Sequence, residues 1–137
     1  FILGAKEDVL KHAIEKIKIQ HDNINIVGYR NGYFEESEEQ EIINQIKELT
    51  PHMIFVALPS PNKELFIYKN KKYFNNCVML GVGGAIDVKA GKIKRAPLFL
   101  RKLGLEGIHR SFQNPLYYGI RYLEFYPKFL KLVIKNI

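Results

Sequence analysis

Apolar and polar residues follow one another along the first two-thirds of the chain in blocks that predict strands alternating with helices. Four short apolar runs occupy residues 1–4 (FILG), 24–29 (INIVGY), 53–58 (MIFVAL) and 77–83 (CVMLGVG). Apolar runs of this length are typical of strands covered on both faces of a parallel sheet. Between them, residues 7–20 and 34–50 place apolar side chains at helical spacing, and residues 59–74 combine a turn with a helix. This order predicts an α/β fold with a parallel sheet and right-handed crossovers.

The last third of the chain changes character after Pro97. Residues 98–112 and 115–137 predict helices with no strand between them, and Pro127 is expected to kink or split the last one. We therefore predict an α/β part over residues 1–95 and a helical, basic, aromatic-rich appendage over residues 96–137.

Chain length and composition limit the class of protein. The chain has 137 residues, enough for one domain with a core, and no apolar run reaches the ~18 residues that span a bilayer. We expect a globular protein, soluble or peripheral, and because the chain begins at Phe1 rather than Met, a fragment of a longer one. The lone cysteine, Cys77, excludes an internal disulfide and is expected to be buried, which fits the cytosol. The four histidines show no metal-ligand spacing, so no metal site is predicted.

Charge is divided unevenly along the chain. Residues 1–64 carry 7 Lys/Arg and 11 Asp/Glu, whereas residues 65–137 carry 14 Lys/Arg and 3 Asp/Glu. A strongly basic C-terminal half predicts an anionic partner: a phosphate, a nucleic acid or an acidic membrane surface.

Two loops follow predicted strands and contain the candidate chemistry. Residues 58–64 (LPSPNKE) follow the third strand, and residues 81–87 (GVGGAID) end the fourth. Because the carboxyl ends of parallel strands share one edge, where α/β sheets bind ligands, both loops are expected at the same edge.

The glycine loop matches neither standard nucleotide-binding motif. Ile86 stands where a dinucleotide fingerprint needs its third glycine, and Ile93 follows Lys92 where a Walker A loop needs Ser or Thr. Glycine still allows a backbone to approach an anion, although a tight strand-to-helix turn is the simpler interpretation. Asp87 has three candidate roles: helix N-cap, catalytic carboxylate, or acceptor for a ligand hydroxyl or imide.

Several cations are candidates for phosphate contacts. Lys63 opens a predicted helix, an unfavourable place for a cation unless it faces an anion, and exposure to solvent is the alternative. The guanidinium fork matches phosphate oxygens, so Arg95 and Arg110 are stronger candidates than the lysines around them. In the last helix Lys128, Lys131 and Lys135 form a basic stripe beside apolar residues, which is typical of a membrane-surface helix or, equally, of a helix packed on the sheet.

The chain resembles the WecG/TagA/CpsF family of bacterial glycosyltransferases. The resemblance is carried by VALPSPNKELFI (residues 56–67), GVGGAIDVKAGKIKRAP (81–97) and LRKLGLEGIHR (100–110), and it extends over essentially the whole chain.

The resemblance implies a Rossmann-like parallel sheet and an appendage that closes the active site and supplies arginines to the donor diphosphate. It implies transfer of an N-acetylmannosamine-type sugar or glucose from a UDP-sugar to a polyprenyl-diphosphate-linked acceptor at the cytoplasmic face of the plasma membrane, for teichoic acid or other surface polysaccharides. The enzyme is expected to be inverting and to need no metal or cofactor.

The family's motifs suggest specific positions here. The donor and its phosphates are expected to contact Lys63, Glu64, Gly83, Gly84, Asp87, Arg95, Arg110 and Arg121, and the membrane to contact Lys128, Lys131 and Lys135. Four departures from the family pattern occur: Pro59 replaces a glycine, Lys63 a glutamine, Gly107 a tryptophan, and Leu116 with Tyr117 an arginine pair. The family's general base lies upstream of the matching segment, so this chain alone is expected to be inactive.

Two other functions fit the sequence. A non-enzymatic basic module would bind nucleic acid or membrane through the cationic half, with aromatic residues stacking on single strands. The cations follow glycine turns at strand ends, however, which favours the donor site over nucleic acid. A catalytically degenerate family member that anchors a partner enzyme at the membrane is the third interpretation.

Overall fold

The computed structural model describes residues 1–113 and 115–135; side chains are described in these ranges except at 117–119, 121, 122 and 124–126. The chain divides into two compact units, Phe1–Lys92 and Ile93–Ile137. The predicted division after residue 95 also assigned a role to each part, and those roles remain a prediction.

The first unit contains one parallel sheet. Its strands are β1 (Ile2–Gly4), β2 (Tyr29–Arg30), β3 (Met53–Ala57) and β4 (Val78–Gly81), in the order β2-β1-β3-β4. Every pairing is parallel, so all four carboxyl ends lie at one edge. The predicted α/β, Rossmann-like class is confirmed.

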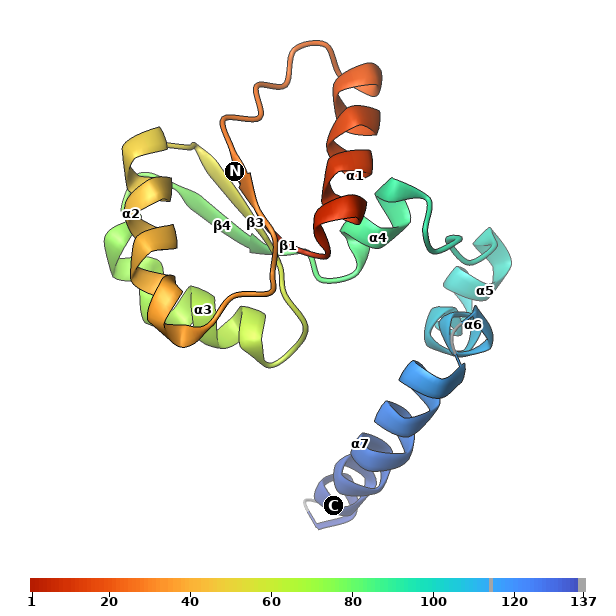
Figure 1. The fold of residues 1–137 in the computed structure, drawn as a ribbon. Coiled ribbons are helices and arrows are strands. Elements are labelled where there is room, and N and C mark those ends of the chain that lie inside the picture. The colour runs from red at the N-terminus through yellow and green to blue at the C-terminus, as the bar shows by residue number, and fades with distance from the viewer. Residues whose placement is uncertain (114, 136–137) are drawn as a thin grey trace. The chain divides into compact units, whose positions relative to one another are not determined.

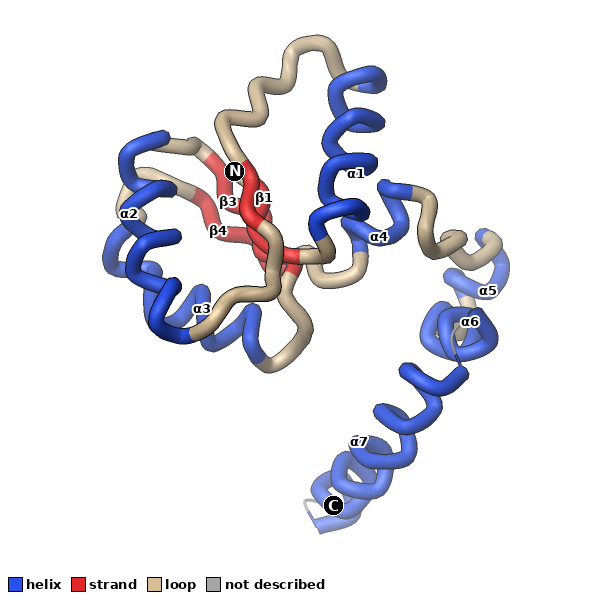
Figure 2. Tube along the Cα trace, viewed as in Figure 1, coloured by secondary structure: helices blue, strands red, loops and turns tan. Residues whose placement is uncertain are grey.

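Helices cover both faces of this sheet. They are α1 (Glu7–Gln20), α2 (Glu39–Leu49), α3 (Asn62–Asn70) and α4 (Ala85–Ala90), with 3-10 turns η1 (Glu36–Glu38) before α2 and η2 (Lys71–Tyr73) after α3. Figure 1 shows α1 and α4 on one face and α2 and α3 on the other, and Figure 2 shows the strands between these layers. This is the arrangement that right-handed crossovers produce for the strand order observed.

Each face has its own buried core. Leu3, Ile54 and Val56 of the sheet pack with Ile46 of α2 on one face, and all four are fully buried. On the other face Ile2 and Ala57 pack with Leu10, Ala13 and Ile86, from α1 and α4. Complete burial of a Leu or Ile side chain contributes about 1.5–3 kcal/mol, so these two layers fix the strand order and the edge at which the loops emerge.

Coverage by α1 and α4 ends before the outer strand. Met53 pairs in register with Val78, and both point to the α1–α4 face, yet they are 44% and 53% exposed. The expectation that the third strand is covered on both faces is therefore wrong at its first residue, because α1 and α4 pack over β1 and the end of β3.

Two local predictions in this unit are wrong. The strand expected over residues 24–29 forms only at Tyr29 and Arg30. Before it, Ile24 is exposed, and Gly28 O accepts a hydrogen bond from the Ile2 N–H of β1. Cys77, expected to be buried, is half-buried beside the exposed start of β4. Partial desolvation raises the pKa of its thiol.

The second unit is helical, as predicted. It contains α5 (Leu98–Lys102), α6 (Glu106–Gln113) and α7 (Pro115–Lys135), and α6 packs against both of the others. Of the two outcomes expected at Pro127, the split is wrong, because α7 is one helix with Pro127 inside it, and the kink remains a prediction. A proline removes a single backbone donor, and the turns on each side retain the other hydrogen bonds of the helix.

Candidate functional site

The loops after β3 and β4 leave the sheet toward opposite faces. The loop after β3 leads to α3 on one face, and the loop after β4 leads to α4 on the other. In α/β sheets, ligands bind where neighbouring loops diverge in this way at the carboxyl edge. The two loops thus lie at the same edge of the sheet, as predicted, and one side chain reaches from the first loop to the second.

Lys63 is that side chain. It stands in the first turn of α3 and runs along the end of β4: a Cβ placed on Gly81 would lie 3.2 Å from Lys63 Cε and 3.3 Å from its Cδ. A Cβ on Gly83 would lie 3.9 Å from the ammonium nitrogen. The Lys63 side chain is only 24% exposed. Gly81 therefore gives this lysine room to place its charge beside the glycine turn.

Glu64 holds the same cation from the loop side. Lys63 Nζ lies 3.0 Å from Glu64 Oε1, and the Ser60 hydroxyl donates to the same carboxylate at 3.1 Å. The hydrogen bond from Lys63, together with the hydrogen bond from Ser60, holds the pKa of Glu64 below its usual value. Glu64 is consequently an anion at neutral pH, able to accept hydrogen bonds from sugar hydroxyls and unable to donate a proton.

The glycine turn supplies one free backbone donor. Gly83 has φ +49°, and its N–H is directed to Val56 O at 3.4 Å, alongside that of Val82 at 2.9 Å. The N–H of Gly84 has no acceptor in the part of the chain that the structure describes. Of the two glycines predicted to line the donor site, only Gly84 presents an amide that a ligand can use.

Asp87 does not cap the following helix. The N-cap of α4 is Gly84, without a side-chain cap, and Asp87 stands in the first turn. The capping role considered for Asp87 is therefore wrong, because the helix begins immediately after the glycines. Its side chain is 27% exposed and lies 3.9 Å from Lys92 Nζ. The other two candidate roles of Asp87, a catalytic carboxylate or an acceptor for a ligand hydroxyl or imide, remain predictions.

The end of α4 explains the Ala-Gly-Lys part of the motif. Gly91 has φ +84°, its N–H donates to Val88 O, and the N–H of Lys92 donates to Asp87 O at 3.0 Å. This is a Schellman motif, in which a left-handed residue closes the helix. Lys16 of α1 adds a hydrogen bond to Ala90 O at 2.8 Å. Gly91 thus closes α4 with its left-handed backbone, and Asp87 takes part in that closure through its carbonyl oxygen.

Replacement of Gly91 by Ala is expected to destabilise the first unit by about 1–2 kcal/mol, because an L-residue is strained in the left-handed region. Its Cβ would also lie 2.7 Å from Lys16 Nζ, so this lysine would have to leave Ala90 O. Denaturant unfolding measures the change. Lys16→Met is the control, since it removes only an exposed hydrogen bond, and an equal loss in this variant would contradict the role assigned to the backbone of Gly91.

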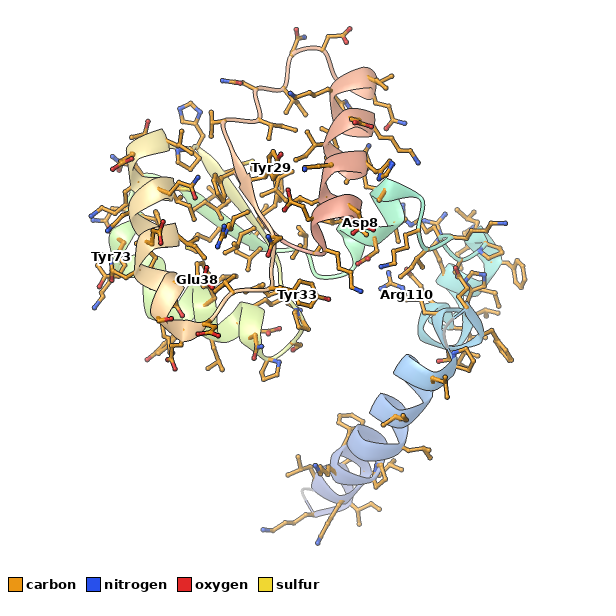
Figure 3. All side chains as sticks on the ribbon, in the orientation of Figure 1. Asp8, Tyr29, Tyr33, Glu38, Tyr73 and Arg110 are labelled. Carbon is orange, nitrogen blue, oxygen red and sulfur yellow. The ribbon has the colours of Figure 1, made fainter. Side chains whose placement is uncertain are left out.

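Sequence reasoning missed a tyrosine at the same edge. The Gly32 N–H donates to Ala5 O at 2.9 Å, and a Cβ on Gly32 would lie 2.9 Å from both Gly4 Cα and Leu58 Cδ2. The loop after β2 therefore packs on the loops after β1 and β3. It presents Tyr33, which is 70% exposed (Figure 3). The available signal was an aromatic residue directly after a strand-ending Asn-Gly turn.

The predicted arginines belong to the second unit. Arg95 is exposed and has no partner within the described residues. Arg110, on α6 (Figure 3), is paired with Glu106 at 2.8 Å, so part of its guanidinium is already engaged. The backbone of Arg121 lies in α7, but its side chain lies outside the described residues.

The basic stripe of α7 is exposed at Lys128, Lys131 and Lys135. Exposed apolar side chains accompany it on the last turns of the helix: Phe129, Leu130, Leu132 and Ile134. Within residues 1–113 and 115–135, no helix is both long enough and apolar enough to cross a membrane.

Relatives of this chain are glycosyltransferases. It is 38% identical over 136 residues to the N-acetylglucosaminyldiphosphoundecaprenol N-acetyl-beta-D-mannosaminyltransferase of Bacillus spizizenii, a match covering 99% of this chain and 51% of that protein. It is 40% identical over 115 residues to the protein of the same name in Bacillus subtilis, covering 84% of this chain and 44% of the relative. The chain spans about half the length of these curated relatives.

A sequence profile of the family "Glycosyl transferase WecG/TagA/CpsF" matches residues 1–137. The match includes both loops at the carboxyl edge and all three helices of the second unit. The resemblance inferred from the motifs is confirmed, and the chain belongs to the WecG/TagA/CpsF glycosyltransferase family.

Proposed function

We propose that this chain forms the donor-binding part of a glycosyltransferase that moves an N-acetylmannosamine-type sugar or glucose from a UDP-sugar to a polyprenyl-diphosphate-linked acceptor. The observation that carries the proposal is the position of Lys63, whose ammonium lies beside Gly83 at the carboxyl edge of the sheet. The names of the Bacillus relatives, which specify a diphosphoundecaprenol-linked acceptor and a mannosaminyl group, support the acceptor and sugar classes.

Donor binding needs groups for the diphosphate and groups for the nucleoside. Lys63 and the amide of Gly84 suit phosphate oxygens, and Asp87 suits the uracil imide or a ribose hydroxyl. Glu64, held as an anion by Lys63, suits a sugar hydroxyl. Tyr33 adds an exposed ring on which a base can stack. Arg95, Arg110 and Arg121 of the second unit complete the set of cations.

The transfer follows from these parts. An acceptor hydroxyl oxygen attacks C1 of the donor sugar from the face opposite UDP, a base takes the hydroxyl proton, and the bond from C1 to the β-phosphate oxygen breaks. The electron pair leaves on UDP, where Lys63 and the arginines stabilise the added charge. We assign the base to none of the residues placed at this edge of the sheet, and we propose donor binding as the role of these 137 residues.

The acceptor class suggests where the enzyme works. A polyprenyl diphosphate lies in a membrane, and the stripe Lys128, Lys131 and Lys135 with its apolar neighbours suits the surface of an anionic leaflet. We propose peripheral attachment at the inner face of the plasma membrane, in the synthesis of teichoic acid or a related bacterial surface polysaccharide.

Titration of UDP into the chain by calorimetry is expected to show saturable binding with a Kd between about 1 µM and 1 mM, the range usual for enzyme substrates. ATP and a short RNA are the controls, because both are anionic and lack the UDP pattern. Salt-sensitive RNA binding without UDP binding would instead support a basic module, the interpretation that the cationic C-terminal half favours.

A further inference from the structure

The backbone of Lys94, next to Arg95, is held by the side chain of Gln113, which stands nineteen residues later in the sequence. The N–H of Lys94 donates to Gln113 Oε1 at 2.8 Å, and Gln113 Nε2 donates to Lys94 O, also at 2.8 Å. The carboxamide of Gln113 therefore pairs with both backbone groups of one residue, as a neighbouring strand would. Lys94 and Gln113 both belong to the second unit.

Only one orientation of the Gln113 amide satisfies this pairing. If its oxygen and nitrogen were exchanged, an N–H would face the N–H of Lys94 and an oxygen would face the Lys94 carbonyl. The remaining Nε2 hydrogen is directed to His109 Nδ1 at 2.9 Å, which accepts it when that ring nitrogen carries no proton. Three contacts thus hold the carboxamide, and His109 comes from the preceding turn of α6.

The pairing fixes the backbone immediately before Arg95. Ala96, the residue after it, is buried, so the guanidinium extends from a segment held on both sides. The Arg95 side chain itself is exposed and has no partner within the described residues. A cationic side chain whose backbone is fixed and whose guanidinium is unpaired is pre-organised, which reduces the entropy lost when it binds an anion.

We propose that Gln113 is a positioning residue that presents Arg95 to the diphosphate of the donor. The inference rests on the proposed function for the ligand and on the Lys94–Gln113 pairing for the geometry. Gln113 touches no substrate; it acts through the backbone at Lys94.

The test compares four variants of the 137-residue chain with UDP as the probe. Arg95→Ala is expected to weaken UDP binding about tenfold, the loss of one charge-assisted contact, and Gln113→Ala about fivefold. In the double variant Gln113→Ala should add nothing to Arg95→Ala, because there is no guanidinium left to position. Ser111→Ala is the matched control, since its hydroxyl bonds only to Gly107 O within α6, and it should bind UDP like the unmodified chain.

A second measurement needs no ligand. Amide hydrogen exchange at Lys94 should be slow in the unmodified chain and in Ser111→Ala, and fast in Gln113→Ala. Equal exchange in all three would overturn the proposal at its geometric step. Loss of affinity in Arg95→Ala with none in Gln113→Ala would overturn it while leaving the proposed function intact. Unchanged affinity in Arg95→Ala would instead refute the donor contact in the proposed function and, with it, the role of Gln113.

Discussion

Gly4→Ala is expected to destabilise the first unit by more than about 4 kcal/mol, a large part of the stability of a domain this size. Gly4 ends β1 with φ +127°, and a Cβ there would lie 2.4 Å from the carbonyl carbon and 2.5 Å from the oxygen of Ala57. These are backbone atoms of the paired strand, so relief requires β1 and β3 to separate. Leu3 and Ile54, both fully buried, would lose their packing. Thermal unfolding by circular dichroism should show a drop of at least about 15 °C.

Gly83→Ala separates the two causes of this loss. Gly83 also has positive φ, +49°, but a Cβ there would meet only Lys63 Nζ at an ordinary 3.9 Å. Backbone strain without a clash should therefore cost about 1–2 kcal/mol. A melting temperature for Gly4→Ala close to that of Gly83→Ala would contradict the close approach of β1 and β3.

The sheet that contains Gly4 was largely predictable from the apolar runs of the sequence. Four apolar runs predicted four strands in a parallel sheet, as observed. The burial on both faces that such runs indicate is found in β1, whereas Val78 and Leu80 of β4 are exposed. The same reasoning extended β2 too far. Residues 24–28 are as apolar as a strand, but Ile26 and Val27 pack against the cores of the two faces without belonging to a strand, so burial of their side chains does not require strand pairing.

The candidate site, like the fold, was predicted only in part from the sequence. Topology alone predicted that the loop before Lys63 and the glycine turn would lie at the same edge, since parallel strands place their following loops there. No local pattern could show that Gly81 makes room for the stem of Lys63, or that the N–H of Gly83 is already bound to Val56. Gln113 was missed for a related reason: its contact with Lys94 joins a side chain to a backbone far away in sequence, and such pairs have no compositional signal.

Replacement of Lys63 by Met is expected to weaken UDP binding about 100-fold. Hydrogen bonds to charged groups contribute about 1.5–3 kcal/mol, and the variant also leaves the Glu64 carboxylate without its cation beside the ligand's phosphates. Like-charge repulsion then adds to the lost contact. Met keeps the length of the stem that lies along Gly81 and Ile67, so the free energy of unfolding should change by less than about 1 kcal/mol. Calorimetry with UDP and denaturant unfolding measure the two quantities separately.

Lys69→Met is the matched control for this variant. Lys69 stands on the same helix and is ion-paired with Glu36 at 3.2 Å, but it lies near the opposite end of α3 from the glycine turn. The Lys69→Met variant removes the same charge from the chain as Lys63→Met, so it corrects for any general attraction between a basic protein and a nucleotide. Equal weakening in both variants would mean that UDP senses net charge only. Weakening confined to Lys63→Met would place the diphosphate at the carboxyl ends of β3 and β4, beside the glycine turn.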